Sequence, residues 1–164
     1  MRLRWYPLAL QIVMLHAITT GAVCAANADW TVAIDSASGA LVLHRELTDH
    51  SVIDFTCARN TPSIGFYYHL TFSGETIASP LAVLFMPGEQ ALELHVTVTP
   101  LANDSYDVSG SFADPVTLLG LLEKEQTIFV QEGGGATGVM LDRLPAQTFA
   151  AGCRNLLAEK DIAK

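Results

Sequence analysis

An alternation of apolar and polar residues with a period of two constrains the fold of this chain more than any other feature. It is sharpest over residues 91–99, where Leu92, Leu94, Val96 and Val98 alternate with Glu93, His95, Thr97 and Thr99. Successive side chains of a β-strand point to opposite faces, so the pattern predicts a strand with one buried and one solvated face. Such strands are typical of antiparallel sheets.

Other segments share this alternation or are rich in β-branched and aromatic residues. Residues 77–85 are also apolar, but Pro80 has no amide donor, so we expect an edge strand or a bent strand there. Gly110 indicates a bulge or a close approach of another backbone segment. The remaining predicted strands cover residues 30–34, 40–44, 51–57, 63–72 and 106–112.

The pattern changes to helical spacing after residue 113. Asp114 followed by Pro115 is typical of a helix start, and the leucines that follow predict a short helix over residues 115–124. Residues 127–131 and 138–142 flank a run of three glycines, and this arrangement predicts a β-hairpin with a flexible tip.

The C-terminal segment predicts a second helix, over residues 145–159. Phe149, Cys153, Leu156 and Leu157 fall on one face of it, which carries the cysteine inward. The fold class we expect is mainly β: an antiparallel β-sandwich or partly open barrel with a short helix and a disulfide-linked C-terminal helix.

The first 28 residues read as a secretory signal peptide. Arg2 and Arg4 form a positive start, an apolar stretch follows, and small residues precede Ala28, after which we expect cleavage. Cleavage after Ala25 is the alternative. Residues 29–164 then form a single β-rich domain, and we expect the protein to be periplasmic or secreted.

Two other interpretations of this leader are a membrane anchor and a lipoprotein. An anchor needs roughly 20 apolar residues, and this run is shorter, so we expect no stable membrane insertion after cleavage. A lipoprotein would be acylated on Cys24, but Val23 and Gly21 stand where a small residue and a leucine are usual.

After cleavage two cysteines remain, Cys57 and Cys153, which lie 96 positions apart. An even number of cysteines in an exported chain predicts a disulfide. This bond would join the C-terminal helix to the strand that ends at Cys57. A redox-active or metal-binding pair is disfavoured, because neither cysteine belongs to a CxxC motif.

The charge of the chain is strongly acidic. Removal of the leader takes two of the nine basic residues and none of the 17 acidic ones, which leaves 7 basic and 17 acidic residues and a net charge of −10. Such a charge repels nucleic acid and anionic membranes and favours a basic protein partner. Solubility of an exported protein is the alternative explanation.

Several of these features resemble small exported bacterial β domains. The residues concerned are Trp30 and Val32 after the leader, Phe55 and Cys57 before a proline and an aromatic strand, and Phe149 with Cys153 on the terminal helix. In this layout the chain is similar to the invasion-associated locus B proteins and the type VI secretion-associated VasI proteins. The resemblance implies an envelope-associated accessory protein and brings no catalytic residues.

Motifs that carry chemistry are few. Ser109 and Ser111 lack the full GxSxG pattern of a nucleophile elbow, and the glycine run lacks the ending of a phosphate loop. His69 and His95 fall on polar strand faces, where an adjacent pairing could bring them together near Glu93. His44 and His50 add no metal-ligand motif, because the histidines form neither an HxH nor an HExxH pattern. We therefore predict no catalytic residue, no cofactor and no metal site.

Binding is better supported than catalysis. Tyr67 and Tyr68 lie on opposite faces of one strand, so at least one is expected to be exposed, and exposed tyrosines often anchor partners. The candidate partner-binding residues are Tyr67, Tyr68, His69 and His95. We expect a non-enzymatic accessory protein that binds another protein of the envelope. An inhibitor of a basic enzyme such as a lysozyme, and a hydrolase or metal-binding protein, are the alternatives.

Overall fold

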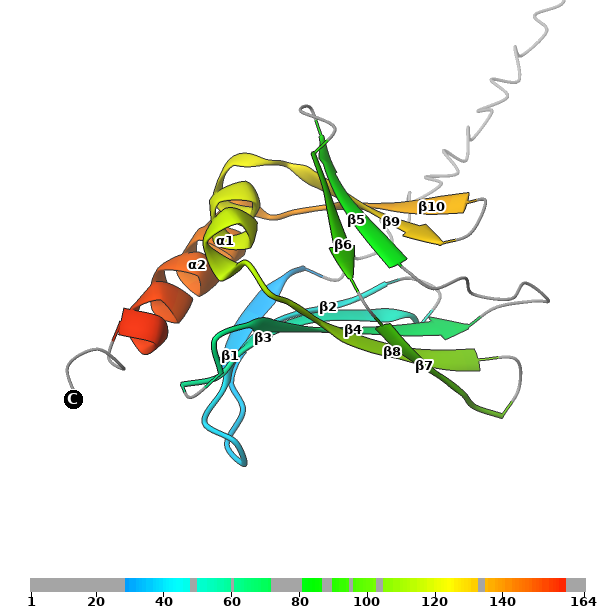
Figure 1. Ribbon diagram of the computed structural model, residues 1–164, viewed down its shortest axis with the longest axis horizontal. Coiled ribbons are helices and arrows are strands. Elements are labelled where there is room, and N and C mark those ends of the chain that lie inside the picture. Colours follow the sequence, from blue (N-terminus) through cyan, green and yellow to red (C-terminus); the bar gives the residue numbers. More distant parts are fainter. Residues whose placement is uncertain are drawn as a thin grey trace, which may run out of the picture.

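The computed structural model describes residues 29–47, 50–59, 61–71, 81–86, 90–94, 96–102, 105–132 and 135–158. The predicted signal peptide and its cleavage site at Ala28 lie outside these ranges. Within them, two antiparallel sheets face each other and two helices cover one side of the pair (Figure 1). The fold is mainly β and sandwich-like, as expected, and it is not a closed barrel.

The larger sheet has six strands in the order β1-β2-β3-β4-β8-β7, each antiparallel to its neighbours. It confirms the strands predicted before residue 73 and over residues 106–112. The bounds are Thr31–Ile34 for β1, Leu41–Glu46 for β2, Val52–Cys57 for β3, Ile64–Thr71 for β4, Val96–Pro100 for β7 and Ser105–Phe112 for β8.

Gly110 does not form a bulge. The ladder between β4 and β8 runs without a break, and Gly110 lies opposite Phe66 on one side and Val96 on the other. The bulge prediction is therefore wrong, because a glycine inside an alternating strand can also be an ordinary ladder position between two larger neighbours.

The smaller sheet has four strands in the order β10-β9-β5-β6. β5 lies between β9 and β6, so the prediction of an edge strand over residues 77–85 is wrong. The described strand begins at Leu81, and its pairing with β9 and β6 needs no amide donor from residue 80; Pro80 and the bend expected there lie outside the described residues. β9 and β10 form the predicted hairpin. The bounds are Leu81–Met86 for β5, Gln90–Leu94 for β6, Thr127–Glu132 for β9 and Gly135–Met140 for β10.

The single strand predicted over residues 91–99 is two strands. Residues 90–94 form β6 of the smaller sheet and residues 96–100 form β7 of the larger sheet. Leu94 is fully buried and Val96 and Val98 pack against the same core. The alternation continues across the change of sheet because the inner faces of both sheets point to one core.

The core lies between the two sheets and under the helices. Phe55 stands at the centre of an aromatic group, with the rings of Trp30, Phe66 and Phe112 at centroid distances of 5.5 to 6.3 Å. Phe55 has no exposed surface. Val83, Leu94, Ile128 and Val130 contribute the buried side of the smaller sheet.

Helix α1 spans Pro115–Lys124 and confirms the short helix predicted there. Asp114 is its N-cap, and its carboxylate accepts a hydrogen bond from the amide of Thr117 at 3.1 Å. This bond satisfies one of the free amides of the first turn and holds the pKa of Asp114 below its usual value, with the Thr117 hydroxyl as the main cause. Leu118, Leu119 and Leu122 are buried.

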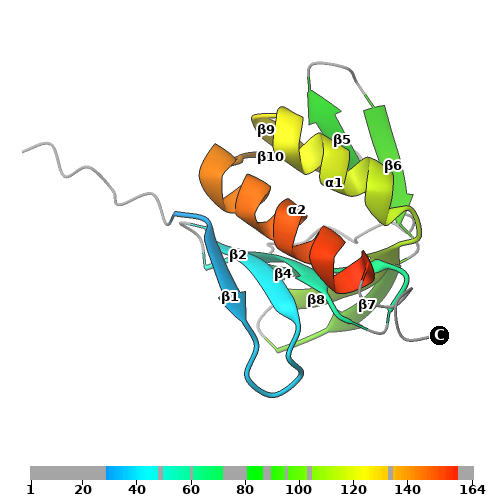
Figure 2. The same ribbon diagram turned by 90° about the vertical axis from the view of Figure 1, so that its left-hand side faces the viewer.

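Helix α2 spans Arg143–Ala158 and lies beside α1 over one end of the sandwich (Figure 2). The predicted disulfide joins Cys153 of α2 to Cys57 at the end of β3, with Cα atoms 5.7 Å apart. Gly152 allows a close approach to β2, since a Cβ there would lie 2.7 Å from a methyl group of Leu41. The disulfide therefore joins the helix to the sheet beside a tightly packed contact.

Trp30 anchors the beginning of the described chain. Its indole N–H donates to the carbonyl of Met140 at 2.6 Å, and its backbone amide donates to the carboxylate of Asp142 at 3.1 Å. The guanidinium of Arg45 lies 5.7 Å above the indole ring. These contacts hold the start of β1 against the connection between β10 and α2.

Candidate functional site

Five polar side chains gather on the face of the six-stranded sheet that points away from the core, here called the outer sheet face. They come from four neighbouring strands, β2, β3, β4 and β8, and are His44, Asp54, Tyr67, His69 and Asp107. Both helices and the smaller sheet lie on the other side of this sheet (Figure 1, Figure 2). The face is therefore not covered by any helix or strand of the described chain.

The register of the strands explains why these residues meet. His44 lies directly opposite Asp54, and Asp54 lies directly opposite Tyr67. Two residues further along β4, His69 lies directly opposite Asp107 of β8. Directly opposed residues of antiparallel strands have Cβ atoms about 5 Å apart, which is close enough for polar side chains to bond.

Asp107 holds two of these side chains. The hydroxyl of Tyr67 donates to its Oδ1 at 2.7 Å, and Nδ1 of His69 lies 2.7 Å from the same oxygen. The hydrogen bond with His69, followed by that from Tyr67, holds the pKa of Asp107 below its usual value. The side chain of Asp107 therefore keeps its negative charge while it positions Tyr67 and His69.

Tyr67 is the centre of the group. Burial, followed by the hydrogen bond to Asp107, raises its pKa to about 12, and the charges of Asp107 and Asp54 add to this rise. The phenol therefore stays neutral over the physiological range. It acts as a hydrogen-bond donor and as an aromatic surface, and it has no nucleophilic character there.

His44 and Asp54 form a second pair on the other side of Tyr67. Nδ1 of His44 lies 2.7 Å from Oδ1 of Asp54. The side chains of His44 and Asp54 keep 42% and 22% of their surfaces exposed, and those of His69 and Asp107 keep 26% and 32%. All four can therefore contact a ligand without any rearrangement of the fold.

The predicted partner-binding residues are only partly brought together. Tyr67 and His69 share the outer sheet face, as their alternation predicts. Tyr68 points the opposite way and is buried, with 1% of its surface exposed, so a partner cannot reach it. His95 lies outside the described residues, and Glu93 belongs to the other sheet, so Glu93 and His69 do not form the expected group.

Sequence reasoning missed Asp54 and Asp107. Both occupy polar positions of alternating strands, which could have marked them as outward-facing. Their pairing with histidines depends on which strands are neighbours and in which register. β8 is separated from β4 by more than 30 residues of chain, and the alternation does not contain that information.

We expect Tyr67→Phe to lower the free energy of unfolding by about 1 kcal/mol at neutral pH, because the hydrogen bond to Asp107 is lost. Wild-type stability should also fall as the pH rises from 10 to about 12, since unfolded Tyr67 ionises at its ordinary pKa of 10.0 while the folded form keeps its proton until about 12. Urea unfolding at several pH values measures both effects. An alkaline fall of the same size in the variant would contradict this assignment.

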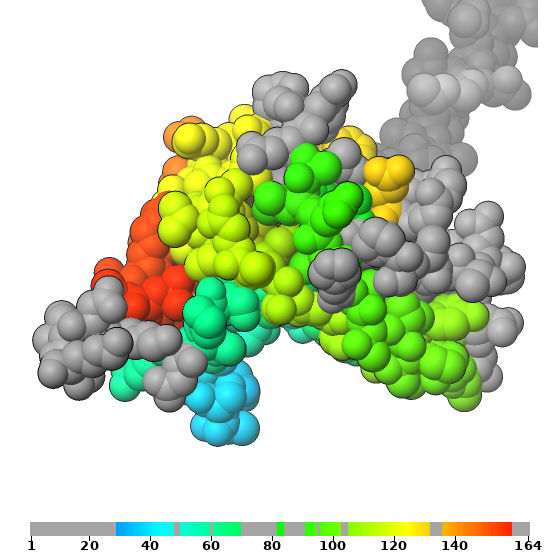
Figure 3. Space-filling model, in the orientation of Figure 1, coloured from blue at the N-terminus to red at the C-terminus, as the bar shows by residue number. Residues whose placement is uncertain are grey.

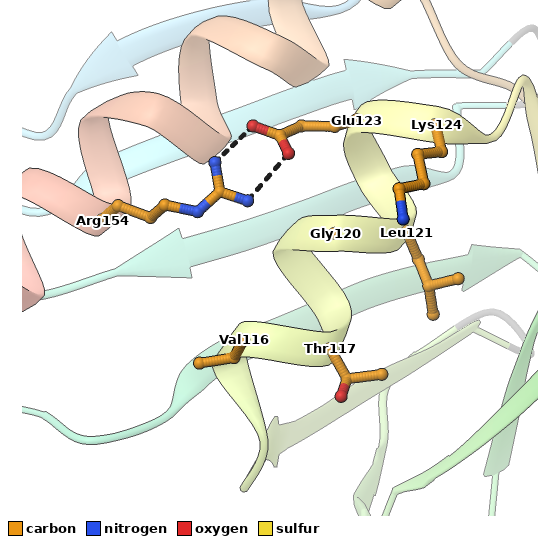
Figure 4. Close-up of a pocket in the computed structure, with 7 residues that line it drawn as sticks. All are labelled: Val116, Thr117, Gly120, Leu121, Glu123, Lys124 and Arg154. Atoms are coloured by element: carbon orange, nitrogen blue, oxygen red, sulfur yellow. Dashed lines mark hydrogen bonds and ion pairs between the residues drawn. The ribbon is translucent and has the colours of Figure 1, made fainter.

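A pocket on the helical side is the second candidate. It has a volume of about 410 Å³ and lies along α1, next to α2 (Figure 4). Two of its charged groups are already paired, because the guanidinium of Arg154 forms a two-pronged contact with the carboxylate of Glu123, with one bond at 2.8 Å. Hydrogen bonding to Arg154 also holds the pKa of Glu123 below its usual value.

The rest of this pocket is formed by α1 alone, with Val116, Thr117, Gly120, Leu121 and Lys124 along its wall. In the space-filling view the yellow surface of α1 and the red surface of α2 adjoin on this side (Figure 3). No cluster of acid–base or nucleophilic groups faces the pocket from the described residues around it. It therefore offers less chemistry than the outer sheet face.

Metal-ligand clusters and membrane-spanning helices are two further features that could indicate a function. Within the described ranges, no group of three or more His, Cys, Asp or Glu side chains is placed to hold a metal ion. Neither described helix is long and apolar enough to cross a membrane. The chemistry that the outer sheet face can perform is hydrogen bonding and charge pairing with a ligand.

No protein-family model, curated protein or solved structure matches this chain. The resemblance to invasion-associated locus B and VasI proteins therefore stays a prediction. The chemistry of the outer sheet face is the feature of the structure that bears on function.

Proposed function

We propose that this chain is a non-enzymatic accessory protein that binds another protein through its outer sheet face. The observation that carries this proposal is the row of partly exposed polar side chains around Tyr67, fixed by hydrogen bonds to Asp107 and uncovered by the described elements. Tyrosine is enriched at binding hot spots because its ring gives contact area at a low entropic cost.

The shape of the site supports binding more than catalysis. Active sites are usually concave pockets that bury most of a small ligand. The outer sheet face is the solvent side of a six-stranded sheet, which is broad and suits a macromolecular surface. The neutral phenol of Tyr67 fits the same role, because its raised pKa makes it a donor and a poor nucleophile.

The location we propose is the periplasm or the exterior of the cell. The disulfide between Cys57 and Cys153 is compatible with an extracytoplasmic location, because such bonds persist in oxidising compartments. The predicted leader with cleavage after Ala28 agrees with this location.

We expect Ser109→Arg to abolish partner binding, because Ser109 is exposed and lies directly opposite Tyr67 on the outer sheet face. Processed protein, purified after export of the full chain, would be immobilised and used to capture envelope and external proteins. Val116→Arg is the matched control, since Val116 is 75% exposed in the pocket on α1. Loss of the captured protein with Val116→Arg and not with Ser109→Arg would move the interface to the helices.

Inhibition of a basic enzyme such as a lysozyme is the second candidate function. It is favoured by the charge of the outer sheet face, where Glu46 adds a third carboxylate to those of Asp54 and Asp107. In that case the captured protein would be a basic enzyme whose activity falls when the exported domain is added. An accessory role predicts a captured protein whose activity is unchanged.

A further inference from the structure

We infer that the outer sheet face binds an arginine side chain of its protein partner, held between Asp54 and Asp107 and over the ring of Tyr67. This inference rests on the proposed function and names the chemistry by which the partner is recognised. Arginine suits the site because its guanidinium is planar, carries five donors and stacks on aromatic rings.

The outer sheet face carries negative charge. Among the described strand residues that face outward on the six-stranded sheet, three are carboxylates, Glu46, Asp54 and Asp107, and none is lysine or arginine. Arg45, the basic residue next to them on β2, points to the other side and lies over Trp30. The complement of this face is therefore a cationic group on the partner.

Tyr67 lies between two carboxylates. Asp54 is its direct neighbour across the strand pair, and Asp107 accepts the hydrogen bond from its hydroxyl. The charges of both carboxylates contribute to the raised pKa of Tyr67, after burial and that hydrogen bond, so both lie close to the phenol. A guanidinium over this ring would meet a carboxylate on each side.

Each of the two histidines bonds to one oxygen of one carboxylate. Nδ1 of His44 bonds to Oδ1 of Asp54, and Nδ1 of His69 bonds to Oδ1 of Asp107. Each carboxylate is thereby oriented through one oxygen, and Oδ2 can accept from a ligand. An arginine that bonds both carboxylates replaces the repulsion between two like charges with two charge-assisted hydrogen bonds.

The test uses acetylated tetra-arginine amide as the probe and processed, oxidised protein, with binding followed by nuclear magnetic resonance. We expect saturable shifts at Asp54, Tyr67 and Asp107. Asp54→Asn combined with Asp107→Asn should weaken binding about tenfold, an effect of about 1.4 kcal/mol. The control is Asp29→Asn with Glu93→Gln, two exposed acids removed elsewhere at the same change in net charge, which should change affinity less than about twofold.

Tetra-lysine is the second probe and should bind several-fold more weakly, because an ammonium does not stack and fork as a guanidinium does. Equal affinity for the two peptides, or equal weakening by the control pair, would overturn the inference by showing unspecific attraction to an acidic protein. The two single variants, Asp54→Asn and Asp107→Asn, are measured as well, so that a folding defect in the double variant leaves the test intact.

Failure of this inference can be separated from failure of the proposed function. A captured partner that is lost with Ser109→Arg but retained by the Asp54 and Asp107 double variant would leave the interface in place and refute its arginine chemistry. A captured partner that neither change affects would refute both.

Discussion

Replacing Cys57 and Cys153 together with alanine is expected to lower the free energy of unfolding by about 4 to 5 kcal/mol and the melting temperature by about 15 °C. The disulfide closes a loop of 96 positions, and in the chain-entropy model a long loop restricts the unfolded chain strongly. Both cysteines are fully buried, and alanine fits a strand end and a helix interior without adding a buried polar group. Thermal unfolding followed by circular dichroism measures the change.

The control for this change is the wild-type protein in the presence of a reductant. It should melt close to the alanine variant, because both lack the covalent link. If the variant melts with the oxidised wild type, α2 is held by packing alone, for example by Phe149 and by the close contact of Gly152 with Leu41. A melting temperature far below that of the reduced protein would instead indicate a packing defect at the two alanines.

The elements of the fold follow from local patterns in the chain. Alternation placed the strands, and Asp114 with Pro115 placed the start of α1, because a side-chain cap and a preset φ act over one turn. These local patterns do not predict how the strands are arranged in the two sheets. Residues 91–99 keep one uninterrupted alternation while the chain passes from β6 to β7, since both strands present the same side to the core.

For the candidate site too, the sequence predicts local features but not the contacts between distant strands. Period-two alternation separates Tyr67 and His69 from Tyr68, which shares its face with the apolar residues Phe66 and Leu70, so the sequence favours burial of the face that holds Tyr68. Asp107 reaches Tyr67 through the pairing of β4 with β8, a contact between residues 40 positions apart. The register between distant strands depends on the packed core as a whole, and the alternation within each strand does not specify it.

The second large effect is expected at Trp30. Trp30→Ala should lower the free energy of unfolding by about 3 to 5 kcal/mol, the usual cost of removing a buried aromatic side chain. Trp30 is only 3% exposed, and its ring lies against Phe55 at a centroid distance of 6.3 Å and carries the donor for the carbonyl of Met140. Urea unfolding followed by far-ultraviolet circular dichroism measures the change, because the variant has no tryptophan after residue 28.

Trp30→Phe is the matched control. It keeps an aromatic ring against Phe55 but loses the indole donor, so we expect a smaller loss of about 1 to 2 kcal/mol. Arg45 also donates to the carbonyl of Met140, so this acceptor keeps one partner in the variant. Equal losses for the two variants would show that the hydrogen bond, rather than the packed ring, carries the effect.

The position of Trp30 explains why one residue at the start of the domain should matter this much. β1 is a four-residue edge strand that pairs with β2 alone, and most of its side chains are exposed. The small surface that β1 buries would hardly keep this strand in place. Trp30 ties this edge to the end of β10 and the start of α2, so it links the two sheets on the side where the disulfide does not reach. A variant that loses less than about 1 kcal/mol would show that β1 is not part of the cooperative core.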